Sequence, residues 1–189
     1  MTDIVLCGVG GQGTVLASKM IAAAAMEKGL GVMSAETIGM AQKGGSVFSH
    51  LRVGDGMHTP MIAKGTADII IAFEPAEAVR MLPFLKDGGK MVVNSRAVKP
   101  VTSVLKGSGY DGKEMIEYLK RNVKDLTMID CDVACREIGS PKVTNMVLLG
   151  AAVRSGALDF DMDDIKTVMR KMVRPQFAEA NEKALDYSN

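Results

Sequence analysis

The chain has little net charge, few aromatic side chains and no long apolar run. Its 23 Lys and Arg residues nearly balance 22 Asp and Glu residues, which gives a formal net charge of +1 over 189 residues. Nucleic-acid-binding proteins usually present a basic face, so this balance argues against such a partner. No apolar run reaches the length of about 18 residues that a membrane helix needs, so we expect a soluble protein without a membrane segment. Trp is absent and Met is abundant, which indicates a core filled by adaptable side chains.

Cysteine and histidine are also too scarce to define a reactive centre. Three cysteines without a signal peptide indicate a reducing, cytoplasmic compartment. Cys131 and Cys135 are four residues apart, but two ligands do not make a zinc or iron–sulfur site, so we expect no metal. Cys7 lies in an apolar run and is interpreted as a small buried residue. No serine is framed as Gly-x-Ser-x-Gly, and neither His50 nor His58 belongs to a catalytic motif, so no catalytic residue is predicted.

A glycine turn near the start of the chain is the most informative feature. Residues 3–7 form an apolar run typical of a buried strand, and residues 14–28 are typical of a helix. Between them, Gly8, Gly10 and Gly13 fit the spacing G-x-G-x-x-G, with Gly11 and Gln12 inside it. Glycines allow a tight turn, and the free N–H groups of a helix N-terminus favour an anion. The sequence therefore predicts a phosphate or carboxylate site at residues 10–14.

Two other interpretations of this turn remain open. Many strand–turn–helix corners need glycine only for packing, without any ligand. A dinucleotide site would need an acidic residue about 20 positions further on, and Glu36 could serve there. Glu36 fits a solvated strand end equally well.

Strands and helices alternate along the rest of the chain, which predicts one domain over residues 1–189. We expect an α/β, Rossmann-like three-layer fold with a mostly parallel sheet and extra C-terminal helices. The predicted strands are 31–35, 46–53, 68–73, 90–94, 126–130 and a short edge strand at 100–105. The predicted helices are 76–85, 113–122, 143–155, one beginning near Asp161, and 176–187. A turn is expected at Gly88 and Gly89, a loop at 106–112, and His50 is interpreted as a half-buried strand residue with a hydrogen-bond partner.

Four blocks of the sequence resemble one family. The run Gly10-Gly11-Gln12-Gly13 resembles the γ-type subunit or domain of the 2-oxoacid:ferredoxin oxidoreductases. Residues 42–52 (QKGGSVFSHLR) resemble a second block, in which Lys43 stands where the family usually has Arg. Residues 67–74 resemble a third block, and the helix opened by Asn145 with Leu149-Gly150-Ala151 resembles a fourth. The likeness covers residues 3–155.

The resemblance implies a subunit that works with a larger partner. That partner would carry thiamine diphosphate, Mg and 4Fe-4S clusters, while this chain would receive coenzyme A. The implied reaction converts a 2-oxoacid of the indolepyruvate (aryl pyruvate) type to an aryl-acetyl-coenzyme A and carbon dioxide, with reduction of ferredoxin. Gly54-Asp55-Gly56 is similar to the start of a thiamine diphosphate motif, but no Asn-Asn follows, so this chain is not expected to bind that cofactor alone.

Two glycine-containing loops supply the candidate coenzyme A site. Because ligands of open α/β sheets bind at the carboxyl ends of strands, the loop at residues 36–45 should face the same crevice as the first turn. Lys43 and Arg52 are expected to bring positive charge to it. The candidate residues are Gly8, Gly10, Gly11, Gln12, Gly13, Lys43, Gly44, Gly45, Ser46 and Arg52. The same loops could instead only shape the subunit interface.

Three functional alternatives remain open on the sequence. The substrate could be another 2-oxoacid, namely pyruvate, 2-oxoglutarate or 2-oxoisovalerate. The chain could be a stand-alone NAD- or FAD-binding oxidoreductase, or a non-enzymatic nucleotide-sensing or interaction domain.

Overall fold

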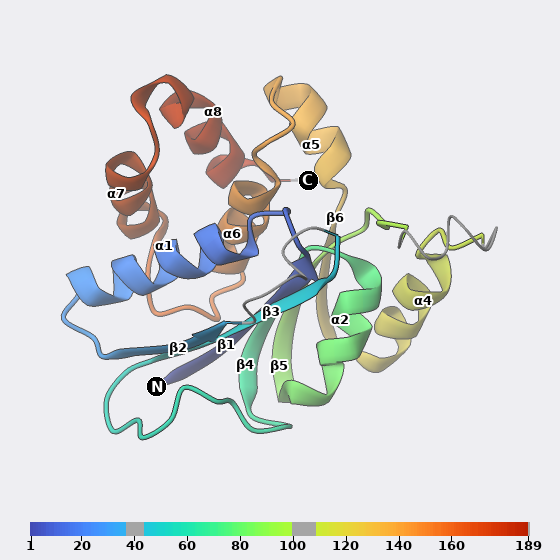
Figure 1. Ribbon diagram of the computed structural model, residues 1–189, viewed down its shortest axis with the longest axis horizontal. Helices are drawn as coiled ribbons and strands as arrows, with labels where there is room; N and C mark the ends of the chain where they lie inside the picture. The colour runs from blue at the N-terminus through green and yellow to red at the C-terminus, as the bar shows by residue number, and fades with distance from the viewer. Residues whose placement is uncertain (37–43, 100–108, 189) are drawn as a thin grey trace.

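The computed structural model describes residues 1–36, 44–99 and 109–188, which are built around a six-stranded sheet (Figure 1). Its strands are β1 (Thr2–Val9), β2 (Val32–Glu36), β3 (Ser46–Val53), β4 (Ala67–Ala72), β5 (Leu85–Asn94) and β6 (Asp125–Ile129). They lie in the order β2-β3-β1-β4-β5-β6. β3 runs antiparallel to both of its neighbours, and the remaining pairs are parallel. Five strands therefore share one direction, which confirms the predicted mostly parallel sheet.

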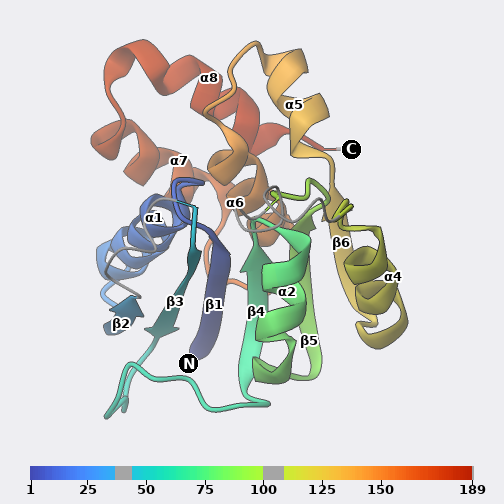
Figure 2. The same ribbon diagram turned by 45° about the vertical axis from the view of Figure 1, so that its right-hand side comes forward.

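Helices cover both faces of the sheet and complete the predicted three layers (Figure 2). One face carries α1 (Thr14–Glu27), α5 (Cys131–Ile138), α6 (Thr144–Arg154), α7 (Met162–Met172) and α8 (Pro175–Asp186). The other face carries α2 (Pro75–Met81) and α4 (Lys113–Asn122). Successive strand residues point to opposite faces, so Ile4 and Leu6 join the first core, whereas Val5 and Cys7 join the second.

The C-terminal helices extend the first layer. α7 packs on α1, and α8 packs on α6. Within the described residues, no helix is long and apolar enough to cross a membrane.

Several predicted boundaries need correction. The helix expected at 76–85 ends at Met81, and Pro83 lies in the 3₁₀ turn Leu82–Phe84 that follows. Gly88 and Gly89 do not form a separate turn, because they lie within β5 where its register against β4 shifts. The edge strand expected at 100–105 and residues 106–108 of the expected loop lie outside the described residues.

Helix α5 was not predicted from the sequence. Asp130 begins it, since its carboxylate accepts hydrogen bonds from the N–H groups of Asp132 and Val133 at 3.0 and 3.1 Å. The helix is only eight residues long, too short for its periodicity to stand out.

His50 ties an irregular segment to the sheet. Its side chain is fully buried, and Nδ1 accepts a hydrogen bond from the N–H group of Ile62 at 3.0 Å. The rings of Phe48 and Phe84 flank the imidazole, with centroids 5.4 and 5.1 Å away. Burial lowers the pKa of His50, so the ring stays neutral and Nδ1 keeps its lone pair for Ile62. The interpretation of His50 as a hydrogen-bonded strand residue is confirmed, with deeper burial than expected.

Gly150 allows the close approach of α6 to the end of α8. A Cβ atom on Gly150 would overlap the carbonyl group of Leu185, whose carbon atom would lie 2.8 Å from it. Arg154, one turn further along α6, donates a hydrogen bond to the same carbonyl oxygen at 2.6 Å and another to the carbonyl of Tyr187. The last turn of α8 is therefore held against α6 by a contact that only glycine permits.

This packing predicts whether a substitution at Gly150 raises or lowers the free energy of unfolding. Gly→Ala inside a helix normally stabilises by about 1 kcal/mol. Gly150→Ala should instead lower the free energy of unfolding by about 1–3 kcal/mol, because the methyl group overpacks the contact. Urea denaturation of the wild type and the variant measures this difference. A variant as stable as the wild type, or more stable, would show that α8 can move away at no cost.

Candidate functional site

The glycine turn after β1 has the backbone conformation that the sequence predicted. Gly11 has φ 103° and Gly13 has φ 89°, both in the left-handed region that disfavours other residues. Gly13 directly precedes α1, and no side chain caps this helix. The turn therefore leaves the first N–H groups of α1 for a ligand or water.

The side chain of Gln12 fixes the turn to the neighbouring strand. Its Oε1 accepts a hydrogen bond from the N–H group of Val9 at 2.6 Å. Its Nε2 donates to the carbonyl oxygen of Phe73, just after β4, at 3.0 Å. Gln12 thus holds the turn in place, and both ends of its amide already have a protein partner.

The side chain of Asn94 donates a second hydrogen bond to the carbonyl oxygen of Phe73. This residue ends β5, is 1 % exposed, and donates from Nδ2 to Phe73 at 3.2 Å. Its Oδ1 accepts hydrogen bonds from the N–H groups of Arg96 and Cys131 at 3.2 and 3.3 Å. The carboxyl ends of β1, β4 and β5 and the start of α5 are therefore joined by two side-chain amides.

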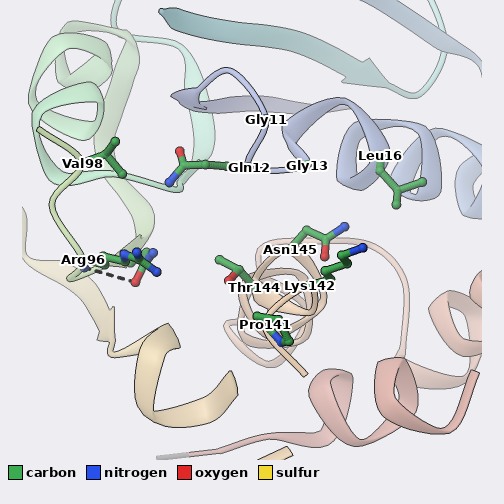
Figure 3. A pocket seen from close by; sticks show the side chains of 11 residues that line it. Gly11, Gln12, Gly13, Leu16, Arg96, Val98, Pro141, Lys142, Thr144 and Asn145 are labelled. Atoms are coloured by element: carbon green, nitrogen blue, oxygen red, sulfur yellow. Dashed lines mark hydrogen bonds between the residues drawn. The ribbon is translucent and has the colours of Figure 1, made fainter. Parts of the chain in front are cut away.

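A pocket of about 530 Å³ opens beside these ties, between the N-termini of α1 and α6 (Figure 3). Its lining comes from the glycine turn and α1, from the residues at and after the end of β5, and from the start of α6. These residues are Gly11, Gln12, Gly13, Leu16, Asn94, Arg96, Val98, Pro141, Lys142, Thr144 and Asn145. Two helix N-termini at one pocket favour an anionic group there.

Asn145 is a nearly buried polar side chain of this pocket. It is 6 % exposed and makes no hydrogen bond among the described residues. Its amide lies against the turn, since Nδ2 would be 3.1 Å from a Cβ atom on Gly13. Lys142 at the mouth has no ion pair within the described ranges, whereas Arg96 pairs with Asp132 at 2.7 Å. The pocket therefore offers an amide and two cationic side chains to a bound anion.

A second pocket, of about 380 Å³, lies on the other side of Val98 and has the opposite character. Ser46 donates to Glu77 at 2.6 Å, and Tyr110 donates to Glu74. Both carboxylates are almost fully buried. Burial, and then the hydrogen bond to Glu74, raise the pKa of Tyr110, so it remains a neutral donor. Glu74 and Glu77 are thus held by separate donors, and two carboxylates do not form an anion site.

The structure brings the two predicted loops together. The N–H group of Gly10 donates to the carbonyl of Gly45 at 2.8 Å, and that of Gly44 donates to the carbonyl of Gly10 at 3.2 Å. Gly11, Gln12 and Gly13 line the first pocket, whereas Gly44, Gly45 and Ser46 line the second. The loops meet as expected, but they border different cavities.

Gly8 has a packing role. A Cβ atom there would lie 2.7 Å from the Cβ atom of Phe73.

Three charged residues were predicted near the turn. The prediction for Arg52 is wrong. Because β3 runs antiparallel to β1, Arg52 lies beside Asp3 at the start of β1, at the end of the sheet away from the glycine turn. There its Nε pairs with the buried Asp3 at 2.8 Å. Glu36 ends β2, which β3 separates from β1, so this acid lies two strands away from the turn. Lys43 lies outside the described residues.

Asn94, Arg96 and Lys142 were missed from the sequence, and Asn145 was noticed only for family resemblance. A usable signal existed for Asn94, since a polar residue at the carboxyl end of an apolar strand often faces the ligand edge. Arg96 and Lys142 had no comparable signal. Arg96 lies in the segment after β5, and Lys142 lies in the loop between α5 and α6. The tertiary structure brings both to the pocket.

The cysteines show no sign of reactivity. All three are free thiols. Burial raises the pKa of Cys7 and of Cys131 well above that of a free thiol, which keeps both protonated. Across the described residues, no three His, Cys, Asp or Glu side chains are grouped closely enough to hold a metal ion.

The three-layer α/β fold thus presents an anion-type pocket at the carboxyl ends of its parallel strands, between the N-termini of α1 and α6. The chain belongs to the pyruvate ferredoxin/flavodoxin oxidoreductase family, whose model matches residues 3–188. It is 36 % identical to indolepyruvate oxidoreductase subunit IorB of Archaeoglobus fulgidus, over 97 % of this chain and 91 % of that protein. It is 26 % identical to the pyruvate/ketoisovalerate oxidoreductases common subunit gamma of Thermococcus kodakarensis, over 98 % and 94 %. The family resemblance inferred from the sequence is thereby confirmed.

Solved structures share the fold. Pyruvate oxidoreductase subunit PORC of Thermotoga maritima matches with a TM-score of 0.68 and 28 % identity, over 98 % of this chain and 93 % of that one. The 2-oxoglutarate:ferredoxin oxidoreductase of Magnetococcus marinus, solved with 2-oxoglutarate, coenzyme A and succinyl-CoA, matches with a TM-score of 0.68 and 21 % identity. The match covers 98 % of this chain but 30 % of that one. The same fold therefore occurs there as one part of a longer polypeptide.

The two hydrogen bonds of the Gln12 side chain predict how a nearly isosteric substitution changes stability. Gln12→Glu keeps the acceptor for Val9 but replaces the donor to Phe73 with a second oxygen, which leaves two acceptors facing each other. The free energy of unfolding should fall by about 1–3 kcal/mol, as expected for a buried carbonyl that loses a partner. Chemical denaturation measures the change. Gln176→Glu, the same replacement at an exposed position of α8, is the matched control and should change stability by less than about 0.5 kcal/mol. Equal effects at the two positions would show that the tie is not important.

Proposed function

We propose that this chain is the smaller, γ-type subunit of a cytoplasmic ferredoxin-dependent oxidoreductase that converts indolepyruvate or a related aryl 2-oxoacid to an aryl-acetyl-coenzyme A. The observation that carries the proposal is the similarity, over nearly the whole chain, to indolepyruvate oxidoreductase subunits. Identity to these reaches 36 %, against 26 % or 27 % for subunits shared by pyruvate and ketoisovalerate enzymes. This difference favours an aryl substrate over pyruvate, 2-oxoglutarate or 2-oxoisovalerate.

The proposal gives the chemistry to a larger partner subunit. Thiamine diphosphate with Mg would supply decarboxylation there, and 4Fe-4S clusters would carry electrons to ferredoxin. In the described part of this chain, the buried carboxylates are already engaged: Asp3 pairs with Arg52, Glu74 accepts from Tyr110, and Glu77 accepts from Ser46. The share of this chain is to bind, orient and present coenzyme A.

The pocket between α1 and α6 is the proposed site for the phosphates of coenzyme A. The N–H groups after Gly13 and the amide of Asn145 can donate to phosphate oxygens, and Lys142 and Arg96 add positive charge. With a net charge of +1 the chain has no general basic surface, so a local site must supply the attraction. A stand-alone NAD enzyme is less well supported, because Glu36 lies two strands from the turn.

The proposal predicts that activity requires both subunits. The isolated chain, given indolepyruvate, coenzyme A, thiamine diphosphate, Mg²⁺ and a dye acceptor, should show no dye reduction. Addition of the purified larger subunit should restore dye reduction in proportion to complex formed. The same assay with pyruvate in place of indolepyruvate tests the substrate. Turnover by the isolated chain, or a preference for pyruvate, would contradict the proposal.

A second prediction concerns the coenzyme A pocket within the assembled complex. Asn145→Ala removes a hydrogen bond to a charged phosphate and should raise the KM for coenzyme A about tenfold or more, since such bonds contribute about 1.5–3 kcal/mol. Lys142→Ala should raise it by a smaller factor, about two- to fivefold, because its exposed charge is screened by solvent.

Lys124→Ala is the matched control for Lys142, because Lys124 is also exposed on the surface and lies outside the pocket. Its KM for coenzyme A should stay at the wild-type value. Steady-state kinetics at two salt concentrations separates the charge effect of Lys142 from the hydrogen bond of Asn145. Unchanged KM values for both pocket variants would place coenzyme A elsewhere.

A further inference from the structure

Residues 54–66, here called the β3–β4 segment, join two strands without forming a helix or a strand of their own (Figure 2). Main-chain hydrogen bonds fix both ends, because the N–H groups of Gly54 and Gly65 each donate to a carbonyl oxygen at 2.9 Å. Between these ends, Ile62 is the one buried side chain, at 3 % exposed, and it joins the core on the α2 face of the sheet. The middle of the segment therefore depends on how Ile62 is held.

Ile62 is attached to the sheet through an uncharged imidazole. Its N–H group donates to Nδ1 of His50 at 3.0 Å, so Nδ1 must keep its lone pair and the ring proton must lie on Nε2. His50 is 0 % exposed, and within the described residues its Nε2 has no hydrogen-bond partner. Only the neutral ring, protonated on Nε2, can therefore accept the hydrogen bond from Ile62.

We propose that His50 is a proton-sensitive latch, which holds the β3–β4 segment on the sheet while its ring is neutral and releases Ile62 when Nδ1 is protonated. A proton on Nδ1 would set two N–H groups against each other at 3.0 Å. It would also place a positive charge between the rings of Phe48 and Phe84, whose centroids lie 5.4 and 5.1 Å from the imidazole. Burying a charge without a hydrogen-bond acceptor is costly. Protonation should therefore accompany local opening of the segment, which brings the ring to water.

The charged groups around His50 do not offset this cost. On β1, the charge of Asp3 favours the protonated ring, but burial has the larger effect and lowers the pKa of His50. The Asp3 carboxylate is already paired with Arg52. β2 places Ala35 opposite His50, and the 3₁₀ turn brings the ring of Phe84, so neither contributes a charge. The titratable side chains of the β3–β4 segment itself are exposed, namely Asp55, His58 and Lys64.

The direction of the pH dependence follows from the lowered pKa of His50. Because the ring binds a proton more readily when the segment is open, acid favours the open state. The latch holds above about pH 6.5, the ordinary pKa of histidine, and weakens as the pH falls below it. The equilibrium constant for opening should rise by up to about tenfold for each pH unit in that range.

Hydrogen–deuterium exchange of the amides in the β3–β4 segment measures this opening in the full chain. Dividing the wild-type rate by that of His50→Asn at the same pH cancels the chemical pH dependence of exchange. The Oδ1 atom of asparagine can accept from Ile62 but does not titrate in this range. The ratio should be constant above about pH 7.5 and should rise about three- to tenfold by pH 5.5.

His58→Asn is the matched control, because His58 is exposed in the same segment and is the only other histidine of the chain. Its exchange should follow the wild type at every pH. The same pH dependence in wild type and His50→Asn would overturn the proposal, and so would its loss in His58→Asn.

A measurement on the wild type alone covers the case in which His50→Asn does not fold. In nitrogen NMR spectra, protonation of the His50 ring and loss of exchange protection at the Ile62 amide should occur over the same pH range. A protonated His50 beside a protected Ile62 amide would show that the ring is not a latch.

Discussion

Two side-chain amides, those of Gln12 and Asn94, donate to the carbonyl oxygen of Phe73, and the candidate site depends on this shared acceptor. Phe73 follows β4 at the centre of the sheet, so the two amides connect the ends of β1 and β5 across it. The oxygen atoms of the same amides accept from Val9 on one side and from Arg96 and Cys131 on the other. Leaving a buried carbonyl without a hydrogen-bond partner costs free energy of folding. The hydrogen bonds of these two amides therefore hold the glycine turn, Arg96 and the start of α5 in fixed positions at this edge of the sheet.

The two pockets on either side of Val98 separate two electrostatic environments over a short distance. On one side, the N-termini of α1 and α6, together with Arg96 and Lys142, favour negative charge. On the other side, Glu74 and Glu77 are buried and already paired with Tyr110, Ser46 and Arg80. An anionic ligand is therefore directed to the first pocket, and the acidic groups of the second hold the flanking segments in place.

Within the described residues, the candidate site is a polar pocket beside the glycine turn. This pocket lies at the start of α1, next to the N-terminus of α6. The glycine turn supplies the backbone donors, and the next two residues, Val15 and Leu16, supply apolar surface.

The sequence by itself determined the local features. The strands at residues 46–53 and near residue 70 and the tight turn at Gly8–Gly13 were all predictable, because each depends on residues close together in the chain. The family was predictable too, since its motifs are local. Tertiary structure alone decided that β3 lies between β1 and β2, which moves Arg52 to the opposite end of the sheet and Glu36 away from the turn. It also decided that Asn145, more than 130 residues after Gly13 in the chain, lies against it. Strand order and helix contacts of this kind arise from long-range packing of apolar faces, and no local pattern of residues specifies which distant segment will provide the partner.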